Sequence, residues 1–112
     1  MKLRYETNQE YEVIIIDEER IDAHNSGDLK EALLHKIEQG NTQLIVHLAQ
    51  VRFIDSSGLG ALLAAYKKIN AGHGKLILVH VQTQVLAMFE LTRLTQVFDI
   101  YAELDDVLAH HG

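Results

Sequence analysis

The sequence has no cysteine, no proline and no tryptophan in its 112 residues. Without cysteine, disulfides, thiolate metal ligands and a cysteine nucleophile are all excluded, which fits a reducing compartment. No apolar run approaches the roughly 20 residues that a bilayer-spanning helix needs. The first residues alternate polar and apolar side chains and lack the apolar stretch of a signal peptide. We therefore expect a cytoplasmic protein without direct membrane contact.

Positive charge is also scarce, because 10 Lys and Arg residues stand against 16 Asp and Glu residues and the net charge is −6. A nucleic-acid-binding protein normally carries a basic face that neutralises phosphates, so we expect no nucleic-acid partner. An aromatic content of 6% offers no platform on which a nucleotide or sugar would stack, and we expect no cofactor. The acidic balance suits a protein that is a monomer when free and meets a basic patch on a partner.

The composition is that of one globular domain. The apolar share of 47% and the charged share of 23% are ordinary for a folded protein. The chain is long enough to bury a single core, and no repeat, linker or shift in composition divides it. We predict one domain over residues 1–112.

Strands and helices are expected to alternate along most of the chain. Apolar, β-branched runs predict strands over residues 2–6, 11–17, 43–48, 75–80 and 98–101. Amphipathic spacing predicts helices over residues 29–37, 58–69, 85–89 and 104–108. The order is therefore β-β-α-β-α-β-α-β-α. Continuous apolar strands that alternate with helices indicate the α/β class, with packed helices on a mixed, mostly parallel sheet whose first hairpin is antiparallel.

One segment could carry chemistry, the polar turn between the strand end at Phe53-Ile54 and the helix expected from Gly58. Ligand sites in open α/β sheets lie at the carboxyl ends of strands. A serine in this turn lies beside the unpaired N–H groups and the positive end of a helix, which stabilise an added phosphate. The same Asp-Ser-Ser pattern is also typical of plain helix capping, and spacing alone leaves both interpretations open. Gly58 and Gly60 permit close approach of another group, but their spacing fits neither a dinucleotide fingerprint nor a P-loop.

The segment Asp55-Ser56-Ser57-Gly58-Leu59-Gly60 strongly resembles the signature of STAS domains, especially those of bacterial anti-sigma factor antagonists. The flanking residues 53–54 and 61–68 agree with it. Ile21-Asp22 is similar to the Leu-Asp pair with which the family begins its first helix. The resemblance spans nearly the whole chain and implies a STAS-type fold and a regulatory protein that is not an enzyme.

In the family, the serine after the aspartate accepts phosphate from an anti-sigma factor with serine kinase activity. The resemblance therefore implies Ser56 as the phosphorylation site, Ser57 as a second candidate, and no catalytic residue in this chain. The unphosphorylated protein would bind the kinase and release a sigma factor, and a PP2C-type phosphatase would reverse the modification. The partner-binding residues implied are Asp22, Asp55, Ser57, Gly58, Leu59 and Gly60. Glu19 departs from the pattern, because the family often has glycine there.

Other roles remain open. The same resemblance is compatible with a binding subunit of a lipid-transport ABC system or with a stressosome-like scaffold. From the residues alone, a serine on a strand-to-helix turn is also similar to a hydrolase nucleophile elbow, although no Gly-x-Ser-x-Gly is present. The downstream side chains that could complete a catalytic group with such a serine are Asp99, Asp105, His110 and His111.

The sequence contains seven histidines, but they lack the spacing of a metal site such as His-Glu-x-x-His, and we expect no bound metal. His47 and His80 are expected at strand ends. His24 is the histidine next to Asp22 and therefore the one nearest the expected site. The remaining members are His35, His73, His110 and His111.

Overall fold

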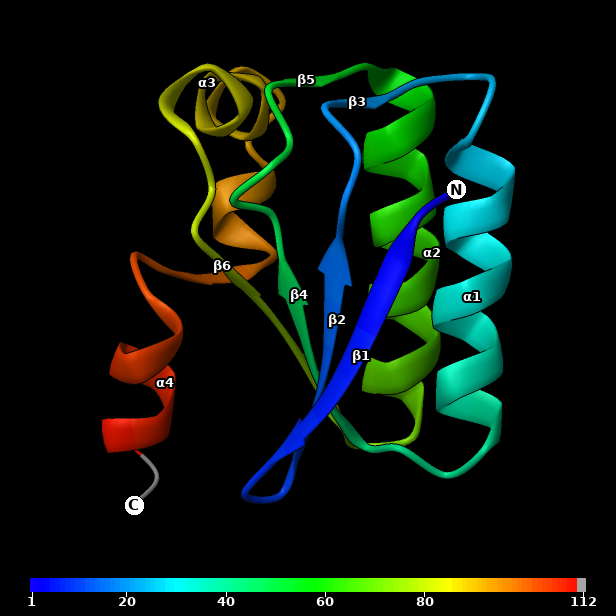
Figure 1. Ribbon diagram of the computed structural model, residues 1–112, viewed down its shortest axis with the longest axis vertical. Helices are drawn as coiled ribbons and strands as arrows, with labels where there is room; N and C mark the ends of the chain where they lie inside the picture. The colour runs from blue at the N-terminus through cyan, green and yellow to red at the C-terminus, as the bar shows by residue number, and fades with distance from the viewer. Residues whose placement is uncertain (111–112) are drawn as a thin grey trace.

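The computed structural model describes residues 1–110, and its centre is a five-stranded sheet in the order β1-β2-β4-β6-β7 (Figure 1). The first two strands pair antiparallel and the others pair parallel, which confirms the predicted mixed sheet. The strands are β1 (Leu3–Asn8), β2 (Tyr11–Ile16), β4 (Gln43–His47), β6 (Lys75–Val79) and β7 (Asp99–Tyr101).

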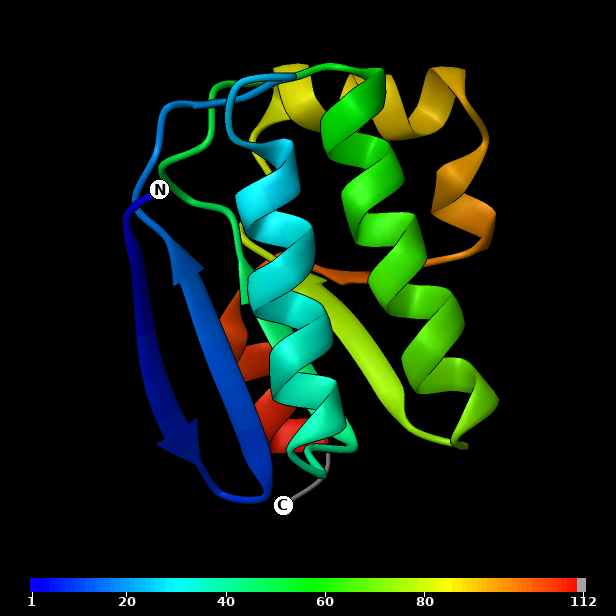
Figure 2. The same cartoon turned by 90° about the vertical axis from the view of Figure 1, so that its right-hand side faces the viewer.

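Helices cover both faces of this sheet, but unequally. They are α1 (Ser26–Glu38), α2 (Ser56–Ala71), α3 (Thr83–Leu91) and α4 (Leu104–His110). The first three each connect neighbouring parallel strands, and right-handed crossovers in one direction place them on the same side. Figure 2 shows α1 and α2 side by side in front of the sheet and α4 behind it. No helix in the described part of the chain has the length and apolar character needed to cross a membrane.

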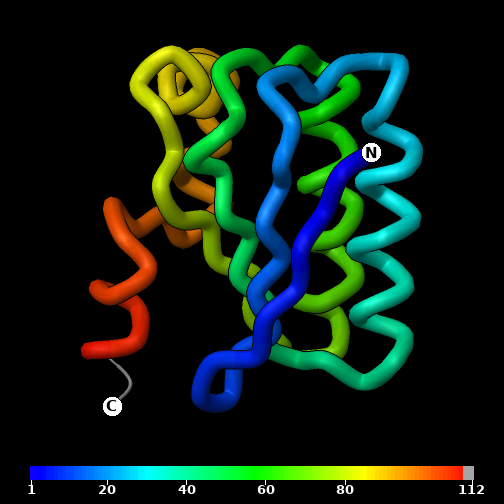
Figure 3. The backbone as a smooth tube through the Cα atoms, viewed as in Figure 1, coloured from blue at the N-terminus to red at the C-terminus, as the bar shows by residue number. Residues whose placement is uncertain are grey.

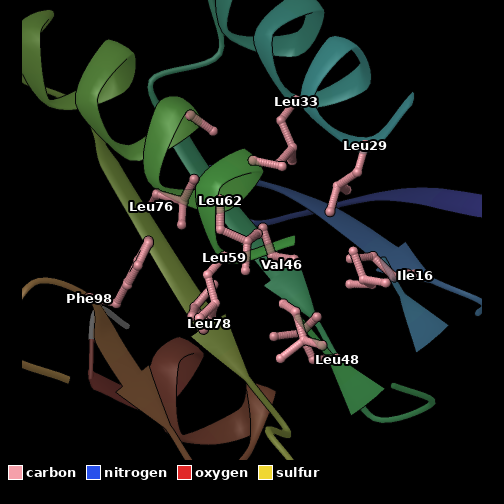
Figure 4. Packing of buried hydrophobic residues seen from close by; sticks show 14 of the residues in the cluster. Ile16, Leu29, Leu33, Val46, Leu48, Leu59, Leu62, Leu76, Leu78 and Phe98 are labelled. Carbon is pink, nitrogen blue, oxygen red and sulfur yellow. The ribbon is translucent and has the colours of Figure 1, made fainter. Parts of the chain in front are cut away.

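Two apolar clusters follow from this arrangement, one on each face of the sheet. Successive strand residues point to opposite faces, so Leu44 and Val46 join the cluster under α1 and α2 while Ile45 joins the one under α4. Figure 4 shows the first cluster, where Leu59 and Leu62 of α2 meet Val46 of β4. The second cluster consists of Tyr11, Val13, Ile15, Ile45, Ile77, Val79 and Val107. The continuous apolar strands are therefore buried on both faces, as their pattern predicted.

The structure adds a second, two-stranded parallel sheet of β3 (Arg20–Ile21) and β5 (Phe53–Ile54). It was not predicted, because two residues are too short to show a period. The last strand begins at Asp99 and not at the predicted residue 98, since the N–H of Phe98, like that of Val97, bonds to the carbonyl of Leu94 at the end of a 3₁₀ turn, η1 (Leu94–Gln96). Both α1 and α2 also begin before their apolar stripes.

Candidate functional site

Two loops meet at one end of the molecule because β3 and β5 pair in parallel. The pairing sets Ile21 opposite Ile54, so the residues that follow, Asp22 and Asp55, leave the small sheet at the same edge. The N–H of Asp55 donates to the carbonyl of Ile21 at 3.2 Å and ties the loops together. The two loops run side by side above the main sheet, next to the first turn of α2 (Figure 3). The structure thus brings the Asp22 and Ser56 segments together.

Asp55 is the N-cap of α2. Its Oδ1 accepts the N–H groups of Ser57 at 2.9 Å and Gly58 at 3.1 Å, and also the hydroxyl of Ser57 at 2.5 Å. The bond from the Ser57 hydroxyl, followed by the bond from the Gly58 N–H, holds the pKa of Asp55 below its usual value. The N–H of Ala23, from the neighbouring loop, acts in the same direction. The capping interpretation is therefore confirmed, and Asp55 carries a negative charge at neutral pH.

The two serines of the turn differ in access. Ser56 is exposed at the first position of α2, and its hydroxyl makes no hydrogen bond within residues 1–110. The half-buried Ser57 donates its hydroxyl to Asp55. One expectation needs correction: the N–H groups of Ser57 and Gly58 are not free to hold a phosphate, because Asp55 already occupies them.

The two glycines of the signature have different surroundings. A Cβ on the buried Gly58 would lie 2.6 Å from Cγ1 of Ile54 and 2.8 Å from Cγ2 of Ile21, so only glycine lets α2 approach the small sheet this closely. Leu59 is 4% exposed and packs in the main core. Gly58 and Leu59 therefore support the site from beneath and do not offer contact atoms on its surface, contrary to the expected role. Gly60 is exposed, with open space where a Cβ would stand.

Asn25 organises the Asp22 loop, a role that the sequence pattern did not indicate. Its side chain accepts the N–H of Asp22 at 2.9 Å and donates to the carbonyl of Arg20 at 2.8 Å. The half-buried Asp22 accepts the N–H of His24 at 3.0 Å. These bonds hold the Asp22 carboxylate beside the Asp55 turn.

Glu19 fits its position although the family often has glycine there. Its carbonyl accepts the N–H groups of Arg52 at 2.7 Å and Phe53 at 3.1 Å, which joins the two loops before the small sheet begins. Its backbone does not adopt the left-handed region that favours glycine, and its side chain is exposed and pairs with Arg52 at 3.8 Å. A side chain at residue 19 therefore leaves the loop geometry intact.

Phe53 is a surface feature that the strand pattern of the sequence did not indicate. The ring is 41% exposed, and the guanidinium carbon of Arg20 lies 4.1 Å from its centroid. Nε of Arg20 also lies 3.6 Å from Asp22. The signal available in the sequence for this surface residue was an aromatic side chain shortly before the turn at Asp55. We name the exposed residues Arg20, Phe53 and Ser56, together with the half-buried Asp22, the docking face.

The residues considered for other chemistry lie elsewhere. Asp99 begins β7 and Asp105 belongs to α4, on the sheet face opposite α2, and both side chains are exposed. The side chain of His110 and all of His111 lie outside the described residues. Within the described residues, no three His, Cys, Asp or Glu side chains are grouped so that they could hold a metal ion.

Comparison with known proteins identifies the family. The STAS domain model matches residues 3–107. The anti-sigma-B factor antagonist of Listeria monocytogenes is 31% identical over 81 residues, which cover 71% of this chain and 70% of that protein. The structure of an anti-sigma factor antagonist from Mycobacterium paratuberculosis superposes with a TM-score of 0.86 at 26% identity, over 97% of this chain and 92% of that one. The phosphorylated form of the Bacillus protein SpoIIAA superposes with a TM-score of 0.71 at 23% identity, over 95% and 96% of the two chains. The chain therefore belongs to the STAS domain family, and its curated relatives there are anti-sigma-B factor antagonists.

Proposed function

We propose that this protein is an anti-sigma factor antagonist, which binds an anti-sigma factor with serine kinase activity and is switched off by phosphorylation on Ser56. The observation that carries the proposal is the exposed, unbonded hydroxyl of Ser56 on the first turn of α2. The relatives' name supplies the class of partner. The same fold in a protein known in a phosphorylated form, SpoIIAA, is compatible with a modified serine.

The geometry favours Ser56 over Ser57 as the acceptor. A kinase must draw the acceptor hydroxyl into its own active site, and Ser56 breaks no bond within the protein when this happens. Moving Ser57 would break its hydrogen bond to Asp55 and remove one of the bonds that stabilise the Asp55 carboxylate. No side chain among residues 1–110 accepts a hydrogen bond from the Ser56 hydroxyl, so the catalytic base and the ATP would come from the partner.

Charge explains how the modification would act. A phosphoserine adds about −1.5 to −2 charges at neutral pH. At position 56 it would join the ionised Asp55 and the nearby Asp22, while Asp55 occupies the two closest N–H groups of the helix. Arg20, the cation of the docking face, already pairs with Asp22. Much of the added charge would therefore stay uncompensated among the described residues and must be desolvated when a partner docks. A loss of about 3 kcal/mol would weaken binding roughly a hundredfold.

The docking face also contains an apolar anchor. Phe53 projects from β5, and Arg20, fixed on the paired strand, restricts its ring through the cation–π contact. Interface cores are enriched in aromatic residues and arginine, and a side chain that is already ordered loses less entropy on binding. Phe53 would therefore contribute binding affinity for the partner, and phosphorylation of Ser56 would regulate that binding.

Phosphorylation is tested directly with the anti-sigma factor kinase from the same organism. The protein is incubated with the kinase and Mg-ATP, and the intact mass is measured for wild type, Ser56→Ala and the matched control Ser57→Ala. We expect wild type and Ser57→Ala to gain one phosphoryl group and Ser56→Ala to gain none. Equal labelling of Ser56→Ala would show that the acceptor is wrong, and no labelling of any variant would favour a fixed binding module, such as a transporter subunit.

Binding is tested by titration calorimetry with the same kinase in the presence of ADP. Ser56→Ala should bind like wild type, and Ser56→Asp or enzymatically phosphorylated protein should bind about a hundredfold more weakly. Treatment of the phosphorylated protein with a PP2C-type phosphatase should restore the original affinity. Equal affinity of the phosphorylated and unmodified proteins would contradict the charge mechanism.

A further inference from the structure

His47 and His80 form a stacked pair at the ends of two neighbouring strands. His47 is the last residue of β4 and His80 follows β6, with ring centroids 4.4 Å apart and ring planes inclined by 27°. The backbone of His80 has a φ of 56°, in the left-handed region that few residues other than glycine adopt, with asparagine, aspartate and histidine as the commonest exceptions. The surrounding structure therefore holds His80 in place against a local backbone cost.

Each ring accepts a hydrogen bond from the backbone. The N–H of Leu104 donates to Nε2 of His80 at 3.1 Å, and the N–H of Ala49 donates to Nδ1 of His47 at 3.4 Å. Leu104 is the first residue of α4, so its N–H has no partner within the helix. His80 therefore caps α4 from a distant part of the chain. A ring nitrogen can accept only while it carries no proton, so both bonds require neutral rings.

Few other contacts hold α4 on the sheet. The helix has seven residues and places Val107 in the second apolar cluster, with Leu104 and Leu108 partly buried around it. It lies apart from the other helices, alone on its face of the sheet (Figures 1 and 2). A short element with few buried apolar contacts belongs to the part of a protein that opens at low free-energy cost.

The charges near the pair do not neutralise an added proton. Neither ring forms an ion pair with a carboxylate within residues 1–110. Burial lowers the pKa of His47, and the neighbouring His80 and Arg4 lower it further, whereas Glu6 and a hydrogen bond with the backbone of His47 itself oppose them. The Asp17 carboxylate, also close to His47, is bonded to Arg4. The acidic and phenolic groups on the elements around His80 are Tyr101, Glu103, Asp105 and Asp106.

We propose that the His47–His80 pair makes the docking of α4 dependent on pH, so that a proton taken up by the pair removes the acceptor for Leu104 and releases the helix while the rest of the domain stays folded. A proton on His80 would also place positive charge at the positive end of α4. The direction follows from the bond to His80: because the N–H of Leu104 can donate only to an unprotonated Nε2, the docked form excludes the proton and the released form binds it more readily. Docking is therefore favoured at neutral pH and weakens as the pH falls below about 6.5, the ordinary histidine value.

Hydrogen exchange of the α4 amides tests the proposal with the purified protein alone. Protection factors are measured by NMR at about pH 7.5 and pH 5.5, so that the intrinsic pH dependence of exchange is divided out. We expect the protection of the Val107 amide to fall on the order of tenfold at the lower pH, since one proton coupled over one pH unit changes a population tenfold. The protection of the Leu62 amide in α2 should stay unchanged.

Two matched variants separate the pair from histidine titration in general. His80→Asn keeps an oxygen acceptor and tolerates a positive φ but does not titrate, so its α4 protection should be the same at both pH values. His73→Asn removes a histidine with a φ of 64° from an exposed turn and should behave like wild type. Loss of the pH effect in His73→Asn to the same extent as in His80→Asn would overturn the assignment.

Titration of the wild-type rings covers the case in which His80→Asn does not fold. The imidazole resonances of His47 and His80 should move with the same midpoint as the Leu104 amide resonance. If the rings take up protons while the Leu104 amide and the α4 protection stay constant, the proposal is wrong. The measurement needs no kinase, and Ser56→Ala should give the wild-type result, so the outcome is independent of the proposed phosphorylation.

Discussion

Replacing Gly58 with alanine should destabilise the domain, whereas the same change at Gly60, two residues along α2, should not. A methyl group at Gly58 overlaps Cγ1 of Ile54 at 2.6 Å and Cγ2 of Ile21 at 2.8 Å, and both isoleucines are at most 1% exposed. They cannot turn away into solvent, so the first turn of α2 must shift from the small sheet. At Gly60 a methyl group meets open space.

The magnitude follows from two opposing effects. Overpacking a buried site costs about 1–3 kcal/mol. Alanine in place of glycine within a helix gains up to about 1 kcal/mol at either position. Gly60→Ala should therefore be as stable as wild type or more stable by up to about 1 kcal/mol. Because the helix preference is common to both variants, their difference of about 1–3 kcal/mol isolates the overlap at Gly58.

The assay is urea unfolding followed by circular dichroism, with the free energy of unfolding taken from the midpoint and the slope. For a domain of this size, the difference between the variants should also appear as about 3–6 °C in Tm for each kcal/mol. A Gly58→Ala variant as stable as Gly60→Ala, with an unchanged slope, would refute the close packing of α2 on β3 and β5.

Three further changes test the cap, the core and a second tight turn. Asp55→Asn should keep a helix cap but lose the stability that depends on the carboxylate charge. The lowered pKa of Asp55 contributes stability above about pH 4 that disappears as the pH falls through the folded-state value, so the variant should be less stable than wild type at neutral pH and its stability should fall less in acid; urea midpoints at several pH values measure this. Leu62→Ala, at a fully buried position, should lower the free energy of unfolding by about 2–5 kcal/mol in the same assay. Gly74→Ala should lower Tm, because the new methyl group would collide with the carbonyl of Thr42; an unchanged Tm in calorimetry would contradict that contact.

The main sheet was predictable because its strands are continuous apolar runs. Residues 13–16 contain only valine and isoleucine, and this pattern indicates burial on both faces whatever lies above and below. The predicted starts of α1 and α2 lie later in the sequence than the observed ones. Apolar periodicity shows where a helix packs, whereas capping decides where it begins. Asp55 accepts two N–H groups ahead of the first core residue of α2, so the helix begins at Ser56.

The small sheet and the histidine pair were beyond prediction for a different reason. Arg20 and Phe53 are 33 residues apart in the sequence, and only the folded chain pairs them. Likewise, nothing local to His80 indicates that its ring would cap a helix at Leu104. Periodicity and propensity describe neighbours along the chain, whereas these contacts depend on how separate elements are brought together.

The neighbouring serines show why a signature cannot by itself separate support from function. Ser57 and Gly58 serve the helix start, because both give N–H groups to Asp55 and Gly58 also makes room for Ile21. Ser56 adds nothing to this network, so a group attached to its hydroxyl changes the charge of the docking face without breaking the fold. A stable modified state needs this separation, since phosphorylation of a hydroxyl that donates to Asp55, as that of Ser57 does, would remove the bond and set a phosphate against the carboxylate.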